Sequence, residues 1–219
     1  MRQDIEGILD KYEIEDPNTL QQLYRVLSDA AFLLGDEAAG LDYQGRMRDL
    51  ESKEALRLTM GIVTRAWVTT RRSVQADPRS PEFAAAFRGR YAEEVDRLPW
   101  DTVKDRLQHV NGQMQIMSEN LLVGLVQSQL DPAVAKSGFL SSDQAAQLLA
   151  YGNALAMVLP VRDQISAVLS ERIAEHHVEK ENIWVSRSLR LDEAAGLDPV
   201  VVAVWDAGVD VDVYRDRLY

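Results

Sequence analysis

Two pairs of acidic residues are spaced so that they could hold a metal ion. Glu51 and Glu54 form one pair, and Glu93 and Asp96 form the other. Residues three apart share one face of a helix, and carboxylate oxygens are the ligands that Mg²⁺ prefers in proteins. These four carboxylates are therefore the candidate metal ligands of the chain.

The same two pairs resemble a motif of a known family. Glu51-Ser52-Lys53-Glu54 and Glu93-Glu94-Val95-Asp96 are similar to the Glu-x-x-Glu and Glu-x-x-Asp pairs of the all-α nucleotide pyrophosphohydrolases, the MazG-like family. The resemblance covers these two stretches only, and the segment between them is longer than that family usually shows. It implies helix-borne carboxylates that hold Mg²⁺ against a nucleoside triphosphate. A Mg²⁺-dependent pyrophosphohydrolase is therefore the enzymatic alternative for this chain.

Two of the three histidines, His176 and His177, stand in an acidic stretch. The surrounding carboxylates are Glu171, Glu175, Glu179 and Glu181. A di-iron bundle needs Glu-x-x-His on two helices and glutamates from two more, and that spacing is absent here. We therefore interpret this stretch as the solvated acidic end of a helix, with His176 on the apolar face.

Other catalytic motifs are missing from the sequence. The chain contains no cysteine, which excludes disulfides, thiolate zinc sites and cysteine nucleophiles. No serine stands in a Gly-x-Ser-x-Gly motif, and there is no glycine-rich phosphate loop. No cofactor is expected, and the sequence favours a non-catalytic function.

The charge balance restricts the class of partner. The 35 acidic residues outnumber the 24 basic ones, which gives a net charge of −11. A strongly acidic protein does not neutralise phosphates, so nucleic acid is an unlikely partner. Arg71 and Arg72, with Arg88 and Arg90 nearby, are expected to form ion pairs within or between subunits. No window is long and apolar enough to span a bilayer, and Asp4 and Glu6 stand where a signal peptide needs apolar residues. We expect the protein in the cytoplasm or in a virus particle.

Apolar residues recur with a helical period along most of the chain. The clearest series is Val103, Leu107, Val110, Met114, Met117 and Leu121, and a second is Leu56, Met60, Val63, Trp67, Thr70 and Val74. Such series place one apolar face along a helix. They predict an all-α, multi-helix bundle with long central helices. The expected helices are 3–12, 17–34, 47–75, 81–98, 100–130 and 141–189, with an interruption at Pro160 and a loop at 35–45.

The last thirty residues differ from the rest because valine becomes frequent there. Two short helices beginning at Pro199, or a β-hairpin turning at Gly208, both fit the pattern. We expect residues 1–190 to form the helical bundle and 191–219 to form a C-terminal docking segment. The candidate partner-binding residues are Val200, Val202, Val204, Trp205, Val209, Val211, Val213 and Tyr214.

These observations favour a helical structural or assembly protein that acts in multiple copies. Its expected partners are protein subunits, above all further copies of the same chain. A virion component such as a head–tail adaptor of a tailed virus is a specific form of this hypothesis. The alternatives are the pyrophosphohydrolase and a small helical regulator.

Overall fold

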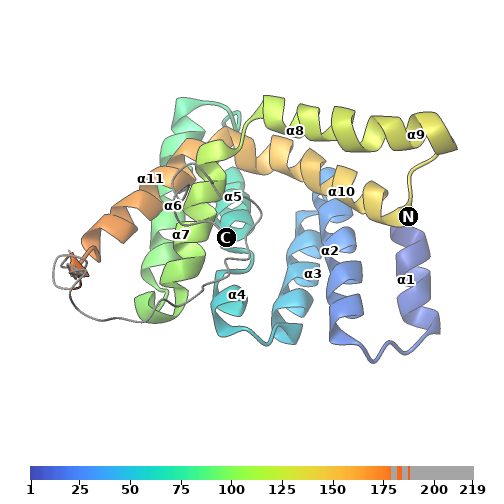
Figure 1. Ribbon diagram of the computed structural model, residues 1–219, viewed down its shortest axis with the longest axis horizontal. Coiled ribbons are helices and arrows are strands. Elements are labelled where there is room, and N and C mark those ends of the chain that lie inside the picture. Colours follow the sequence, from blue (N-terminus) through green and yellow to red (C-terminus); the bar gives the residue numbers. More distant parts are fainter. Residues whose placement is uncertain (179–181, 184–186, 188–219) are drawn as a thin grey trace, which may run out of the picture. The chain divides into compact units, whose positions relative to one another are not determined.

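Figure 1 shows the computed structural model, which describes residues 1–178, 182, 183 and 187. Among these residues the regular secondary structure is helical throughout, with eleven α-helices and no β-strand. The predicted all-α fold is therefore confirmed. The chain divides into two compact units, Met1–His177 and Val178–Tyr219, and all of the named helices belong to the first unit.

The first three helices are α1 (Arg2–Lys11), α2 (Pro17–Leu33) and α3 (Glu37–Leu50), and α2 packs between the other two. The carboxylate of Asp16 caps α2 by accepting the backbone N–H groups of Asn18 and Thr19, and Gly35 ends it in the left-handed region at φ +79°. These two features explain why the predicted helix at 17–34 begins and ends where it does, to within one residue. The predicted loop at 35–45 is wrong, because the carboxylate of Asp36 caps α3 by accepting the N–H of Ala39 at 3.1 Å.

The predicted helix at 47–75 is divided into three pieces. After the end of α3 the chain forms α4 (Glu54–Thr59) and α5 (Ile62–Ser73). Between these two helices Met60 is extended, and Gly61 has a left-handed backbone at φ +77°. A helix does not continue through such a residue, so this long-helix prediction is wrong.

The main core lies among α5, α6 (Pro81–Asp96), α7 (Trp100–Ile116) and α11 (Arg162–Glu175). Its aromatic centre is formed by Phe87 stacked on Tyr91, with ring centroids 5.6 Å apart, and by Trp67 edge-on to Phe83. Fully buried aliphatic side chains from α5, α6, α7 and α11 surround these rings; they include Val68, Val95, Val103, Leu107, Ile165 and Leu169. These helices thus bury their apolar faces against one another.

The predicted helix at 100–130 is also divided. α7 ends at Ile116, and Ser118 caps the next helix by accepting the N–H of Leu121 at 3.2 Å. From there α8 (Glu119–Leu125), the π-helical segment η1 (Val126–Leu130) and α9 (Asp131–Ser137) follow without a turn. The predicted helix end at 130 is wrong, because the helix continues into α9 and Pro132 lies in the first turn of α9.

The chain then returns as α10 (Ser142–Asn153), η2 (Ala154–Val158, π), η3 (Leu159–Val161, 3₁₀) and α11. The predicted helix start at 141 is confirmed by a capping box, in which Ser141 and Gln144 each accept the other's backbone N–H. Both π-helical segments end two residues before a proline, Pro132 or Pro160. The proline ring would clash with the carbonyl of an α-helical turn, and the wider turn removes that clash. α11 ends at Glu175, before the predicted end at 189.

No helix in the described part of the chain has both the length and the apolar character needed to cross a membrane.

Candidate interaction surface

The four candidate metal ligands lie on three elements: Glu51 at the end of α3, Glu54 on α4, and Glu93 with Asp96 on α6. Glu51 follows α3, where its carboxylate accepts the N–H of Lys53 at 2.8 Å, and Glu54 opens α4. Glu93 and Asp96 are exposed on α6, and Glu94 between them pairs with Arg65 at 2.7 Å. Among the described residues, no three acidic or histidine side chains are grouped so that they could hold a metal ion. The structure does not bring the four carboxylates together as one site.

His176 has a packing role at the end of α11. Its ring stacks on Trp100, with centroids 4.3 Å apart and an interplanar angle of 21°. Nδ1 of His176 lies 3.0 Å from the carbonyl oxygen of Arg172. His177 is exposed beside it. These contacts join the C-terminal end of α11 to the start of α7.

Three of the clustered arginines form ion pairs within the chain, which is one of the two arrangements predicted from the sequence. Arg71 and Arg72 on α5 both pair with Glu37, at 3.3 and 3.5 Å. Arg88 pairs with Glu171 on α11 at 2.6 Å. These pairs connect helices of one molecule, so this arginine cluster is not a free basic surface.

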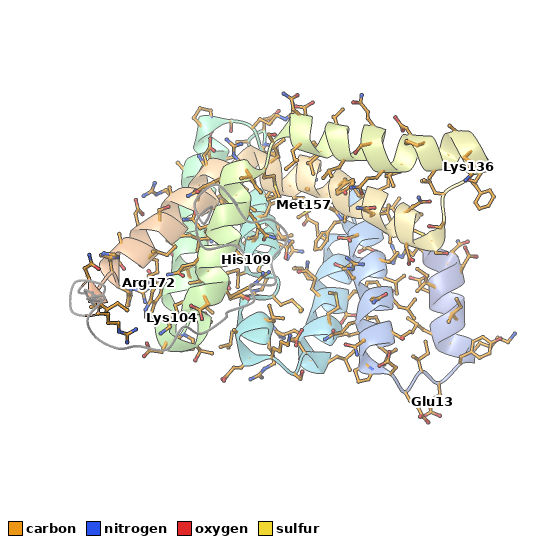
Figure 2. The ribbon with its side chains drawn as sticks, in the orientation of Figure 1. Glu13, Lys104, His109, Lys136, Met157 and Arg172 are labelled. Atoms are coloured by element: carbon orange, nitrogen blue, oxygen red, sulfur yellow. The ribbon has the colours of Figure 1, made fainter. Side chains whose placement is uncertain are left out.

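A surface that the sequence analysis did not single out is formed by α8, η1, α9 and α10, which run alongside one another in Figure 1. We call residues 118–153 the charge-poor hairpin. Its only charged residues are Glu119, Asp131, Lys136 and Asp143, whereas 27% of the whole chain is charged. Lys136, the single basic residue, lies at the far end of the hairpin (Figure 2). A count of charged residues along the sequence would have found this segment.

The charge-poor hairpin also exposes large apolar side chains. Phe139 at its tip is 69% exposed and Leu148 on α10 is 43% exposed. Three further exposed residues, Leu121, Val123 and Val134, lie on α8 and α9. Single exposed apolar residues are common on protein surfaces. Here, however, they gather on a segment with few charges, which is the composition of an interface core.

The hairpin is attached to the rest of the protein through α10. Nδ2 of Asn153 donates to the backbone carbonyl of Asp29 on α2 at 2.9 Å and to its carboxylate at 3.0 Å. A Cβ atom at Gly152 would lie 3.3 Å from the side chain of Leu33, so α10 approaches α2 closely. The other arm of the hairpin consists of α8, η1 and α9. It is held by the buried side chains of Leu122 and Leu130, and by the amide of Gln147 on α10, which donates to Gln129 at 3.4 Å. The arm of α8 and α9 thus leaves much of its surface free.

The predicted partner-binding residues, from Val200 to Tyr214, lie outside the described residues, as does the predicted domain boundary between 190 and 191. Their role therefore stays a prediction.

Comparisons with known proteins do not supply a family for this chain. No family model, no curated protein and no solved structure matches it.

Proposed function

We propose that the protein is a non-catalytic helical assembly protein whose copies associate through the charge-poor hairpin. The observation that carries this proposal is that exposed apolar side chains and a scarcity of charge coincide on residues 118–153. The occupant of this surface is a second copy of the same chain.

The net charge favours this face over the others. Two copies that each carry a net charge of −11 repel one another. The repulsion is weakest where charged side chains are few, and the hairpin carries only three acidic residues and one basic residue. Association through this face therefore buries apolar side chains without bringing many like charges together.

The size of the hairpin suits a stable interface. The arm of α8, η1 and α9 runs from Glu119 to Ser137, which corresponds to a length of about 28 Å. Two such helices side by side cover a width of about 20 Å. That area is of the order needed to bury about 800 Å² of accessible surface on each partner. Burial of apolar surface contributes about 25 cal/mol per Å².

In its most specific form, the proposal is that the protein is a structural component of a tailed virus particle, such as a head–tail adaptor. A helical unit with an association surface, together with a valine-rich C-terminal segment that contacts a neighbouring subunit, suits a protein that acts in a closed ring of copies. The second contact would be made by the predicted docking residues between Val200 and Tyr214.

The proposal is tested by measuring the mass of the full-length protein in solution by light scattering. We expect an oligomer whose dissociation constant rises about ten- to a hundredfold in the Phe139→Ser, Leu148→Ser double variant, because two apolar contacts are lost. The matched control is the Leu34→Ser, Tyr12→Ser double variant, since these side chains are 71% and 57% exposed but lie outside the hairpin. The control should associate like the native chain.

Circular dichroism should show the same helical content in all three proteins. A native protein that is monomeric at high micromolar concentration would contradict the proposal. Equal association of the hairpin variant and the native chain would show that the contact lies elsewhere.

A further inference from the structure

A cavity of about 270 Å³ lies at the meeting point of α3, α5, α6, α7 and α11. Most of its wall is apolar, from Ile62, Val110, Met114 and neighbouring side chains. Its polar lining includes Tyr91 and Arg106, and no aspartate or glutamate lines it. In a chain with 35 acidic residues, a cavity lined by arginine and by no carboxylate is unusual.

Tyr91 provides an unused hydrogen-bond donor in this cavity. Its side chain is 0% exposed, and its hydroxyl has no hydrogen-bond partner among the residues that the structure describes. Burial raises the pKa of the Tyr91 phenol, so the hydroxyl keeps its proton and acts as a donor. A buried hydroxyl without a partner is costly and calls for a ligand or an ordered water.

Arg106 on α7 provides a second unused donor. Its Nε atom is buried without a partner, and its guanidinium forms no ion pair with any described residue. Arg65, on the neighbouring α5, shows the usual arrangement: it pairs with Glu94 at 2.7 Å and donates to the carbonyl of Met60 at 3.1 Å. An arginine whose Nε is buried without a counter-charge is ready to accept an anionic partner.

The third group of donors is the N-terminus of α5. Gly61, Ile62, Val63 and Thr64 all line the cavity, and no side chain caps this 12-residue helix. The Thr64 hydroxyl is already engaged, because it donates to the carbonyl of Gly61 at 2.9 Å and to Oε1 of Gln44. The first backbone N–H groups of a helix have no partner within the helix, and the helix dipole there favours negative charge.

We propose that this cavity binds a small organic anion, a carboxylate on a compact apolar body. Tyr91, Arg106 and the α5 N-terminus donate to the carboxylate, while the aliphatic side chains contact the apolar body. The volume lies just below the range of about 300–1,000 Å³ that is typical of sites for drug-sized ligands, so the ligand is smaller than those.

The test is calorimetric titration of the full-length protein with benzoate and hexanoate, and with the neutral benzamide and hexanamide as controls of the same shape. We expect at least one carboxylate to bind at least tenfold more tightly than its amide, because only the anion complements the unpaired guanidinium. Inorganic phosphate lacks the apolar body and should bind more weakly than that carboxylate.

Three variants locate the site. Arg106→Gln should weaken carboxylate binding about tenfold, and Tyr91→Phe about threefold. Lys104→Gln is the matched control, because Lys104 is an exposed cation on the same helix that does not line the cavity (Figure 2). It should leave the affinity unchanged.

The proposal is overturned if neither carboxylate binds, if the amides bind equally well, or if Arg106→Gln binds like the native chain. If phosphate binds more tightly than both carboxylates, the inference that the ligand has an apolar body is overturned. The comparison of acid with amide needs no variant, so it holds even if a substitution impairs folding. The hairpin variants change no residue of the cavity and should bind benzoate like the native chain.

Discussion

Asn153 and Asp29 lie 124 positions apart in the chain and are joined by two hydrogen bonds, one to the carbonyl and one to the carboxylate of Asp29. This contact attaches the base of the charge-poor hairpin to α2. It also places a carboxylate in a partly buried position, and burial raises the pKa of Asp29 although the bond from Asn153 opposes the change. The attachment is therefore sensitive to pH.

We expect Asp29→Asn to raise the melting temperature at pH 7. The pKa of Asp29 is higher in the folded than in the unfolded protein. The ionised carboxylate therefore lowers the free energy of unfolding once the pH exceeds the pKa of the folded protein. Below the unfolded pKa of about 3.9, Asp29 is neutral in both states and the cost vanishes. Thermal melts of both proteins at pH 3.5 and pH 7 should differ only at pH 7. The exposed Asp10→Asn serves as a control for the loss of one negative charge.

Two left-handed glycines, Gly35 before α3 and Gly61 between α4 and α5, should respond differently to alanine. Gly35→Ala meets no neighbouring atom within 4 Å, so it should cost only the backbone strain of about 1 kcal/mol. At Gly61 a Cβ atom would lie 2.8 Å from Oε1 of Gln44, which already accepts the Thr64 hydroxyl. Gly61→Ala should therefore cost about 1 kcal/mol more. Urea unfolding measures both changes, and equal losses would show that Gln44 moves freely.

Tyr91→Phe should stabilise the ligand-free protein by about 1 kcal/mol, because it removes a buried hydroxyl that has no partner. Tyr43→Phe is the contrasting variant, since the Tyr43 hydroxyl donates to the carboxylate of Glu6 at 3.0 Å. That second change should lower the free energy of unfolding. A loss of stability in Tyr91→Phe would mean that ordered water already satisfies the hydroxyl.

Removal of residues 188–219 should leave the helical unit folded. Its core lies among residues 62–169, within the unit Met1–His177. We expect a cooperative melt with weaker association, because the predicted docking residues Val200 to Tyr214 are lost. Circular dichroism and light scattering provide the two measurements. An insoluble truncated protein, or one with a much lower melting temperature, would instead indicate that this segment covers its own bundle.

The sequence predicted helix ends where a cap or a proline marks them, but not where the apolar period continues across a break. Asp16, Gly35, Pro81 and the Ser141 capping box stand where the structure begins or ends helices. The break at Gly61 was missed because the apolar series Leu56, Met60, Val63 and Trp67 keeps the helical period across it.

The polar contacts within the core were also beyond the reach of the sequence. Asn111 is buried on α7, where it donates to Ser170 at 3.0 Å and accepts from Ser166 at 2.8 Å. Its partners are more than fifty positions away, so only the packing of α7 on α11 reveals them. The same reason applies to Tyr91 and Arg106, which meet in one cavity from different helices. The spacing of residues along one helix predicts which of them share a face, but it does not predict which residues of another helix contact that face.

The two π-helical segments have a consequence for insertions and deletions. A π turn closes between residues five apart, and an α turn between residues four apart. Each segment therefore holds one surplus residue. Deleting one residue from Val126–Leu130 would let α8 and α9 join as a regular α-helix, with α9 close to its present rotation, because the wider turn absorbs the surplus residue. The π turn thus lets the chain carry one extra residue without changing the direction in which Val134 on α9 faces.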